Sequence, residues 1–344
     1  MTYRIAINGY GRIGRCVLRG FYESTNYVDL RLVAINDVAS IDKLAHLTRY
    51  DSTHGRFLGT VEEWESKIVV NGDPIVVVNS SSLDSLPWQE LSVDLVMECS
   101  GSFTSREIAE KHLAVGAKKV LFSHPAESDV DATLVYGINH EKLDPAATII
   151  SNASCTTNCI VPVLKVLDDK FGIDSGVITT IHSAMNDQPI IDSYHTNDLR
   201  RTRSAMQSII PVDTELAKGI ERILPHLNGV LEVQAIRVPT VNVSAMDLTV
   251  SVNKPTTSEL INQSMREASS AFLPNVLGVT DEPLASCDFI HDPRSAIVDL
   301  TQTRVAANHL VKLLIWFDNE WAYANRMLDV AQFIYRQSKY TGGV

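Results

Sequence analysis

The sequence predicts an α/β protein of two domains, an open and mainly parallel sheet followed by an α+β domain with a mainly antiparallel sheet. The chain has 344 residues, which exceeds the size at which one hydrophobic core usually divides. Its first half alternates short apolar runs with helical patterns. Its second half carries longer apolar runs with few helices between them. We place the domains at residues 1–154 and 155–318, with a C-terminal helix at 319–338 that returns to the first domain.

Composition excludes several classes of protein. Hydrophobic residues make up 45% and charged residues 21% of the chain, which is typical of soluble globular proteins. No apolar run is long enough for a transmembrane helix, and the N-terminus enters a predicted strand at once, without a signal peptide. The five cysteines have no framework spacing, and the net charge is −11. We therefore expect a cytoplasmic protein that binds neither nucleic acid nor membranes.

A glycine-rich motif follows the first predicted strand, Arg4–Asn8. The sequence Gly9-Tyr10-Gly11-Arg12-Ile13-Gly14 precedes a helical pattern and then a second apolar run, Leu30–Asn36. Such glycines permit a tight turn, the close approach of a pyrophosphate and helix–strand packing, and the pyrophosphate binds the helix N-terminus. This order of elements predicts a Rossmann domain. The alternative is a glycine turn kept only for packing.

An acidic residue ends the second strand of this domain. Asp37 lies 23 residues beyond Gly14, where a carboxylate should bond the adenosine ribose hydroxyls. It would also repel a 2′-phosphate, so the sequence predicts NAD rather than NADP as cofactor. Ser123 and Cys99 follow two later strands and are expected at the ligand-facing edge of the sheet. We interpret Cys99 as part of the wall and not as a reagent.

The stretch Ser154-Cys155-Thr156-Thr157-Asn158-Cys159 predicts a nucleophile. It opens a predicted helix that ends near Phe171, with Ser154 suited to the N-cap. Cys155 then lies in the first turn, where unpaired N–H groups and the helix dipole favour a thiolate. The alternative is a buried structural cysteine, which is our interpretation of Cys159. No further ligands lie at zinc-like spacing, so no metal site is expected.

Two further features fit a thiol that acts on a phosphorylated substrate. His182 follows the predicted strand Val177–Ile181, and a nearby imidazole both lowers a thiol pKa and moves protons. A core histidine is the alternative. Arg200, Arg201 and Arg203, together with Arg237, form a plausible anion site in an acidic protein. A solvated surface run or a subunit contact is the alternative for these arginines.

Four motifs together resemble the glyceraldehyde-3-phosphate dehydrogenase family over essentially the whole chain. They are the segments 8–15, 151–159, 237–243 and 316–321. The resemblance implies a homotetramer, NAD as cofactor and an aldehyde phosphate as substrate. It also implies that Cys155 is the nucleophile and His182 its base. The implied cofactor-binding residues are Gly9, Gly11, Arg12, Ile13, Gly14, Asp37, Ser123 and Asn319, of which Asn319 would bind the nicotinamide amide. The implied substrate-binding residues are Ser154, Thr156, Arg201, Thr214 and Arg237.

Two departures from the family pattern bear on the reaction. Met185 replaces the threonine that phosphorylating members have three residues after the histidine, and Glu215 replaces a glycine after Thr214. A lost donor to a charged phosphate costs about 1.5–3 kcal/mol. A carboxylate about 4 Å from an inorganic phosphate would repel it by roughly 4 kcal/mol at an effective dielectric of about 20. We therefore count Glu215 among the substrate-site residues and expect water to attack the acyl group.

The segments 182–188, 200–203 and 209–214 resemble the D-erythrose-4-phosphate dehydrogenase branch of the family. This resemblance implies oxidation of a four-carbon sugar phosphate to 4-phospho-D-erythronate, which feeds pyridoxal 5′-phosphate synthesis. The nearest alternative is a phosphorylating glyceraldehyde-3-phosphate dehydrogenase of glycolysis. A noncatalytic NAD-binding or RNA-binding protein is a more remote alternative.

Overall fold

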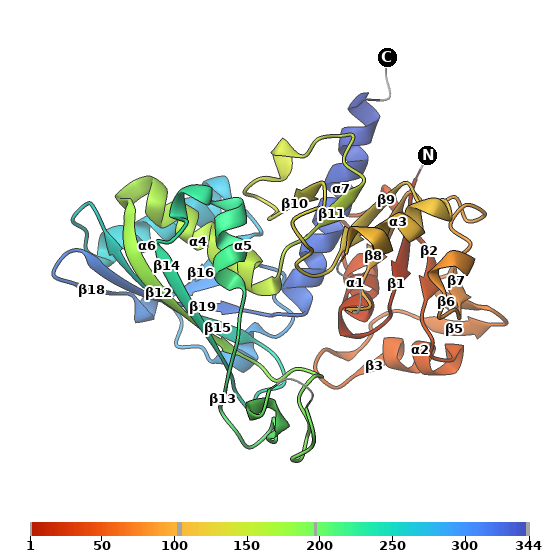
Figure 1. Cartoon of the computed structure of the whole chain (residues 1–344), viewed down its shortest axis with the longest axis horizontal. Coiled ribbons are helices and arrows are strands. Elements are labelled where there is room, and N and C mark those ends of the chain that lie inside the picture. Colours follow the sequence, from red (N-terminus) through yellow and green to blue (C-terminus); the bar gives the residue numbers. More distant parts are fainter. Residues whose placement is uncertain (1, 102–104, 196–197, 342–344) are drawn as a thin grey trace. The chain divides into compact units, whose positions relative to one another are not determined.

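The structure is a computed structural model that describes residues 2–101, 105–195 and 198–341. The chain divides into two compact units, residues 1–154 with 323–344, and residues 155–322 (Figure 1). Among the described residues, no helix has the length and apolar character needed to cross a membrane.

The first unit is built on a nine-stranded sheet in the order β10-β11-β9-β8-β1-β2-β7-β6-β5. The strands of this sheet are β1 (Tyr3–Asn8), β2 (Leu30–Asn36), β5 (Val61–Trp64), β6 (Lys67–Val70), β7 (Asp73–Val78), β8 (Leu95–Glu98), β9 (Lys119–Phe122), β10 (Ala132–Thr133) and β11 (Ile149–Ser151). A separate two-stranded sheet consists of β3 (Tyr50–Asp51) and β4 (Gly55–Arg56). The helices of the unit are α1 (Arg12–Glu23), α2 (Ile41–Arg49), α3 (Arg106–Ala114) and most of α7 (Trp321–Thr341).

The expected parallel sheet is found from β10 to β7, but two pairs at its other edge are antiparallel. β5 pairs with β6, and β6 with β7, in antiparallel register. The turn between β6 and β7 is Asn71-Gly72, and both residues have positive φ, 50° and 91°. This dipeptide is typical of a two-residue hairpin turn. The sequence therefore carried a hairpin signal that the prediction of an open parallel sheet overlooked.

Helix α7 packs within the first unit, where it contacts the loop after α1 and the start of β1. The Tyr27 hydroxyl donates to Asp329 at 3.0 Å, and the rings of Tyr3 and Tyr335 lie 5.6 Å apart. The helix begins at Trp321, two residues later than predicted, and Asp318 Oδ1 accepts the N–H of Trp321 at 2.8 Å. An aspartate that accepts this hydrogen bond ends the preceding loop and caps the helix.

The second unit is built on an eight-stranded sheet in the order β13-β14-β12-β15-β19-β17-β16, with β18 paired to β19. Its strands are β12 (Ile173–His182), β13 (Ile210–Val212), β14 (Leu231–Arg237), β15 (Ser244–Val252), β16 (Leu277–Thr280), β17 (Ala296–Asp299), β18 (Arg304–Ala306) and β19 (Leu310–Phe317). Its helices are α4 (Cys155–Phe171), α5 (Leu216–Ile223) and α6 (Ser258–Glu267). Only β12–β14 and β16–β17 are parallel pairs, so the sheet is mainly antiparallel, as predicted.

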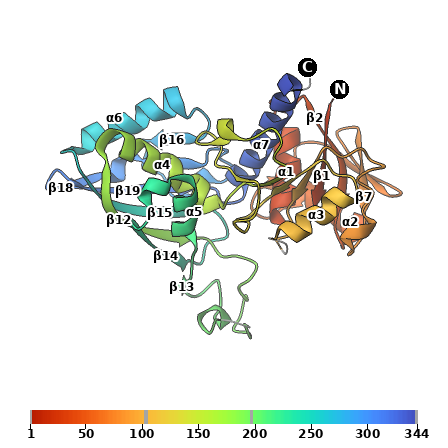
Figure 2. The same ribbon diagram turned by 45° about the horizontal axis from the view of Figure 1, so that its top comes forward.

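Helices α4, α5 and α6 lie on one face of this sheet (Figure 2). Helix α4 packs on β12, β15, β17 and β19, and it ends where Gly172 has φ of 68°. In β12, Ile178, Thr180 and His182 share one face by strand alternation, and all three are buried. Because α4 covers that face, the last residue of β12 is placed beside the helix layer.

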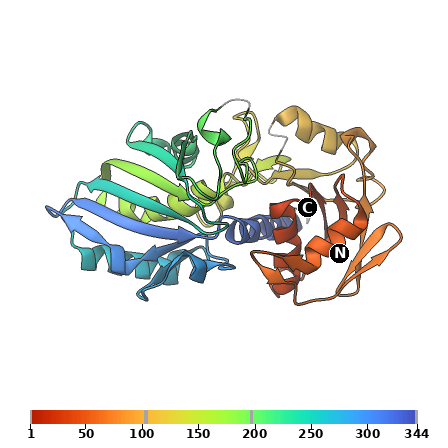
Figure 3. The same ribbon diagram turned by 90° about the horizontal axis from the view of Figure 1, so that it is seen from below.

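Four strand ends meet at one end of the sheet, where the strands lie side by side in Figure 3. His182 pairs with Arg237 at the ends of the parallel strands β12 and β14. The antiparallel β15 begins beside the end of β12, with Ile181 paired to Ala245. The end of β19 returns beside the start of β15, since Ser244 pairs with Phe317. Residues far apart in the chain are thereby collected at one place.

Candidate active site

The glycine turn of the first unit has the shape that a dinucleotide requires. Gly9 has φ of 88°, and a Cβ there would lie 2.4 Å from the Ser100 backbone. A Cβ at Gly14 would lie 2.3 Å from the Gly9 carbonyl oxygen. Gly11 is exposed, and a Cβ there would meet nothing within 4 Å. The first and third glycines thus serve packing, while the second leaves the turn open to a ligand.

Helix α1 begins within the glycine-rich motif, at Arg12. Gly11 is the N-cap, no side chain caps the helix, and its first turn holds no acidic residue. The Arg12 side chain bonds Asp51 at 2.7 Å, so Arg12 and Ile13 can contribute their backbone N–H groups. These donors and the helix dipole fit the pyrophosphate of a dinucleotide.

Asp37 follows β2 directly and is partly exposed. Its two carboxylate oxygens accept the N–H groups of Tyr10 at 2.7 Å and of Ala39 at 2.9 Å. A carboxylate has about four acceptor positions, so capacity remains for ribose hydroxyls. Ser123 follows β9 at the same edge. Burial raises the pKa of Cys99 far above its ordinary value, which fits its interpretation as an inert wall residue.

Cys155 and His182 meet in the second unit, as the thiol–imidazole hypothesis requires. Cys155 is the first residue of α4, and its Sγ lies 3.8 Å from His182 Nε2. His182 Nδ1 lies 2.8 Å from the Ser183 carbonyl oxygen, to which it donates. The proton on Nδ1 leaves the Nε2 lone pair facing the thiol. The imidazole is therefore oriented to accept the thiol proton.

The helix start predicts a thiolate at Cys155, but burial in the folded unit favours the neutral thiol. Burial raises the pKa of Cys155 to about 11, although Arg237 and the N–H groups of Thr156 and Cys155 itself act to lower it. Burial and then Arg237 lower the pKa of His182 to about 4. Both groups are thus favoured in their neutral forms. Proton transfer from Sγ to Nε2 would leave opposite charges 3.8 Å apart, whose attraction offsets part of the burial penalty.

Arg237 and Arg201 form the basic side of the site. Arg237 Nη1 lies 3.4 Å from the Ser183 carbonyl oxygen. Its closer approach to His182 Nδ1, 3.1 Å, is a contact between two donors, because Nδ1 already carries the proton. Burial and then Arg201 act to lower the pKa of Arg237, whereas Asp187 and Cys155 oppose that shift. These charges therefore lie close enough to influence one another.

Two carboxylates offset the charge of Arg201. Its Nη1 lies 3.0 Å from Asp187, and its Nε lies 3.5 Å from Asp198. The arginines of this segment were predicted to form an anion site, without regard to the aspartates that pair with them. The sequence itself offered a partner for these arginines, since Asp187 is only five residues beyond His182. As a result, the site carries less positive charge than the arginines alone suggest.

Two comparisons with known proteins bear on this geometry. Residues 3–106 match the glyceraldehyde 3-phosphate dehydrogenase NAD binding domain, and residues 154–319 match the C-terminal domain of the same enzymes. Together the matches cover well over half of the chain. The chain belongs to the glyceraldehyde-3-phosphate dehydrogenase family. It is an NAD-dependent oxidoreductase of that family, and its first unit carries the NAD-binding domain.

Asn319, Ser183 and Ser244 form a buried cluster of hydrogen-bonded side chains that was not predicted from the sequence. Asn319 Oδ1 accepts hydrogen bonds from Ser183 Oγ at 3.0 Å and from Ser244 Oγ at 2.9 Å. The two serines are fully buried. Because two donors occupy the amide oxygen, Asn319 turns its Nδ2 donors away from them. An acceptor such as a carboxamide oxygen is the group that these donors would bind.

The remaining predicted substrate residues lie near the starts of α4 and α5. Ser154 and Thr156 flank Cys155 and are partly exposed. Thr214 Oγ1 accepts the N–H of Leu216 at 3.2 Å. Glu215 is 77% exposed and bonds Lys218 at 2.8 Å, so its charge is offset locally. The geometry therefore does not support the expected repulsion of inorganic phosphate by Glu215.

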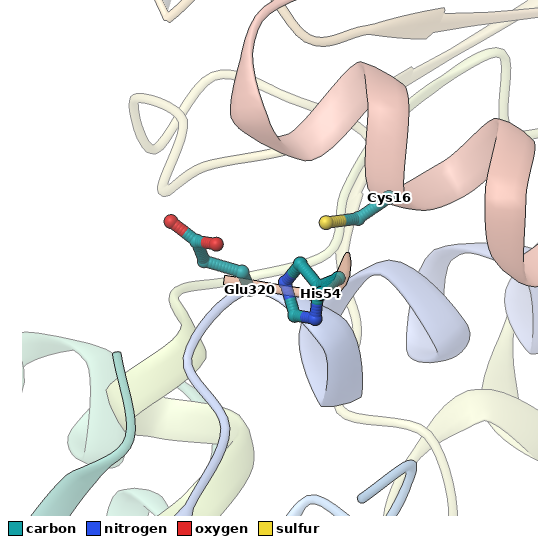
Figure 4. Close-up of side chains that lie close together, drawn as sticks. All are labelled: Cys16, His54 and Glu320. Atoms are coloured by element: carbon teal, nitrogen blue, oxygen red, sulfur yellow. The ribbon is translucent and has the colours of Figure 1, made fainter. Parts of the chain in front are cut away.

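A cysteine–histidine pair lies elsewhere in the first unit. Cys16 on α1 and His54 after β3 are seen in Figure 4, with ligand atoms within 4.8 Å of each other. Glu320, which the figure also labels, belongs to the second unit. Two side chains are fewer than the four ligands of a structural zinc site. We assign no metal to this pair.

Proposed function

We propose that this enzyme oxidises D-erythrose 4-phosphate to 4-phospho-D-erythronate, with NAD as oxidant and water as the final acyl acceptor. The observation that carries the proposal is the pairing of Arg201 with Asp187 and Asp198, in a segment where Met185 stands in place of a hydroxyl donor. The family match supports the NAD-dependent oxidation of an aldehyde phosphate. The choice of a four-carbon aldehyde rests on the resemblance of the segments around His182 and Arg201.

The position of Met185 supports water over inorganic phosphate. Its side chain is 44% exposed, and its backbone N–H donates to Gln188 Oε1 at 3.2 Å. A thioether is at most a weak acceptor and donates nothing to an anion. The phosphorylating relatives have a threonine hydroxyl at this point. With Arg201 already paired, a free phosphate dianion would find fewer available donors here, whereas a neutral water molecule needs none of them.

The proposed chemistry begins at the thiol. The Sγ–H proton moves to His182 Nε2 while Sγ bonds to C1 of the aldehyde, and His182 then passes this proton to the aldehyde oxygen, which gives a hemithioacetal and a neutral imidazole. The Thr156 and Cys155 backbone N–H groups face the sulfur and stabilise the charge that develops there. Bound NAD supplies the hydride acceptor. His182 then removes the hydroxyl proton as C1 is oxidised, and the acyl group remains on Cys155 as a thioester.

Water completes the reaction. Once His182 has released the hydroxyl proton to solvent and is neutral again, it accepts a proton from water as the water oxygen bonds to C1. The C1–S bond breaks, and Cys155 is released with the proton returned through His182. The product is the carboxylate of 4-phospho-D-erythronate. The oxidation has consumed one NAD and one water, and the arginines hold the substrate phosphate throughout.

A second candidate is the phosphorylating oxidation of glyceraldehyde 3-phosphate. The orientation of Glu215 favours it, because a carboxylate paired with Lys218 presents no barrier to inorganic phosphate. Both candidates use Cys155 and His182 in the same way. They differ in the chain length of the aldehyde and in the molecule that releases the acyl group.

The two candidates are separated by measuring NADH formation from each aldehyde, with and without inorganic phosphate. We expect D-erythrose 4-phosphate to be oxidised at rates that differ by less than about twofold between the two conditions, a barrier difference below roughly 0.5 kcal/mol. The product should be the free acid, identified by mass spectrometry. Strict dependence on phosphate with the three-carbon aldehyde would overturn the proposal.

Met185→Thr provides the matching variant, because it restores the hydroxyl that phosphorylating relatives have at this position. We expect it to acquire a stimulation by phosphate that the parent enzyme lacks. Met206→Thr is the control, since Met206 has the same 44% exposure but lies outside the site residues named above. If both variants respond to phosphate equally, the hydroxyl at position 185 is not the cause.

We also propose a homotetramer. Large apolar side chains of the segment between β12 and β13 are strongly exposed in the single chain, namely Ile190, Ile191, Tyr194, Leu199 and Ile209. Isolated exposed hydrophobic residues are common, but such a concentration in one segment is typical of an interaction surface. Sedimentation equilibrium should give four times the 38.0 kDa chain mass. A monomer at micromolar concentration would exclude this assembly.

A further inference from the structure

A carboxylate lies completely buried at the ligand-facing edge of the first sheet. Glu98 is the last residue of β8 and has no exposed surface. Its Oε1 accepts the Ser100 N–H at 2.8 Å. Its Oε2 accepts the Asn8 side-chain amide at 2.5 Å and lies 3.0 Å from His112 Nε2. The reaction proposed above makes no use of this group.

The neighbouring indole fixes the proton on His112. Trp88 Nε1 lies 3.0 Å from His112 Nδ1, and an indole N–H can only donate. His112 Nδ1 is therefore an acceptor, and its proton lies on Nε2, which donates to Glu98. His112 therefore adds a third hydrogen bond to the buried carboxylate, besides those from Ser100 and Asn8. Burial raises the pKa of Glu98, yet the bonds from His112, Ser100 and Asn8 together bring it below its ordinary value.

The hydrogen bonds continue from Glu98 across the ends of three more strands. Asn8 Oδ1 accepts from Asn36 Nδ2 at 2.7 Å, and Asn36 Oδ1 accepts from the Ser80 N–H at 3.0 Å. Asn8, Asn36 and Glu98 end β1, β2 and β8, which are adjacent in the sheet, and Ser80 follows β7. Ser80, Asn36 and Asn8 each donate toward Glu98, and Asn36 Nδ2 also donates to the Ser80 carbonyl oxygen at 3.1 Å. The chain of hydrogen bonds from Ser80 therefore ends at a carboxylate that only accepts.

This network holds the two backbone segments between which the first glycine of the dinucleotide turn is packed. Gly9 follows Asn8 and donates its N–H to the Asn36 carbonyl at 2.8 Å, and the Cys99 N–H donates to the Asn8 carbonyl at 2.7 Å. A Cβ at Gly9 would meet Ser100 at 2.4 Å. Glu98 bonds both Asn8 and Ser100, so it sets the width of the slot that Gly9 occupies.

We propose that Glu98 is a positioning residue for cofactor binding, whose buried carboxylate holds the Gly9–Gly14 turn in the conformation that receives the pyrophosphate of NAD. Glutamine at position 98 has almost the same shape but replaces one acceptor oxygen with a donor. That donor would face another donor, from Asn8, His112 or Ser100. The turn would lose part of its support while the hydrophobic core below it stays filled.

Direct titration of NAD into Glu98→Gln tests the proposal. We expect the Kd for NAD to rise by about tenfold, or roughly 1.4 kcal/mol. The inhibition constant of adenosine, which lacks a pyrophosphate, should change by less than about twofold. At saturating NAD, kcat and the KM for the aldehyde should stay within about twofold of the parent values. These ratios are obtained with either aldehyde, so they do not depend on which substrate is correct.

Two further variants complete the experiment. Asp299→Asn is the matched control, because Asp299 is also a buried carboxylate but lies in the second unit. It should leave the Kd for NAD unchanged. Asn8→Ala removes the donor on the turn side, and combined with Glu98→Gln it should weaken NAD binding by less than the product of the single effects.

Three results would overturn the proposal. One is a folded Glu98→Gln that binds NAD within about twofold of the parent, since that is no resolved change in binding free energy. Another is an equal loss of NAD and adenosine affinity, which would indicate a general distortion of the domain. If Glu98→Gln does not fold, Asn8→Ala decides the matter, and unchanged NAD affinity in that variant counts against the proposal.

Discussion

Cys155→Ala is expected to abolish NADH formation from any aldehyde phosphate, with a loss of about 10⁴-fold or more. The reason is that no other group can form the thioester, since Cys155 Sγ is the thiol that faces His182 Nε2. The glycine turn at residues 9–14 and Asp37 belong to the first unit, so the Kd for NAD should stay within about twofold of the parent value. Steady-state kinetics and calorimetric titration of NAD measure the two quantities on the same preparation.

Cys159→Ala is the matched control for this variant. Cys159 lies one turn further along α4, is fully buried, and burial raises its pKa well above the ordinary value. Its replacement should cost stability but leave turnover in the folded protein. Turnover near the parent rate in Cys155→Ala would show that the nucleophile is another group.

His182→Asn should produce the second large effect, a decrease in kcat of about 10²–10⁴-fold. Asparagine cannot take the thiol proton that Nε2 is placed to accept. The parent enzyme should also show a characteristic pH dependence. His182 acts as a base only in its neutral form, and its pKa is lowered to about 4. Hence kcat/KM should not decrease through protonation of His182 above that pH, and it should fall as the pH drops through about 4.

A comparison of pH profiles identifies the group whose protonation causes the loss of activity at low pH. Rapid pH-jump kinetics should show the acid limb in the parent enzyme and its absence in His182→Asn. A limb that persists unchanged in the variant would assign the titration to another residue. The melting temperature of the variant, measured at neutral pH, separates a loss of chemistry from a loss of fold.

Much of the first unit could be predicted because its signals are local. The glycines at positions 9, 11 and 14 and the acid at position 37 act through a turn, a helix start and a strand end that follow one another in sequence. Their roles need only the conformations available to glycine and the direction of a helix dipole. The antiparallel pairs at β5–β7 were missed because the apolar runs alone were read, without the turn chemistry of Asn71-Gly72.

The charges of the second unit illustrate what the sequence could not give. Arg201 was predicted to bind an anion. Asp187 and Asp198 are near it in the sequence, but only the fold shows that their carboxylates pair with its guanidinium. Glu215 read as a barrier to phosphate, and only the fold paired it with Lys218 at the surface. A charge acts according to its neighbours and its exposure, and neither quantity is contained in residue identity.

By itself, the sequence determined the two fold classes, the dinucleotide turn and the cysteine at the start of α4, because each follows from residues close together in the chain. The tertiary structure alone decided that His182, Arg237 and Asn319 meet near that cysteine, since four strand ends converge in the second sheet. It also decided the protonation of the pair. The helix N-terminus favours a thiolate, but burial, a property of the whole packed unit, raises the Cys155 pKa to about 11 and so makes His182 necessary.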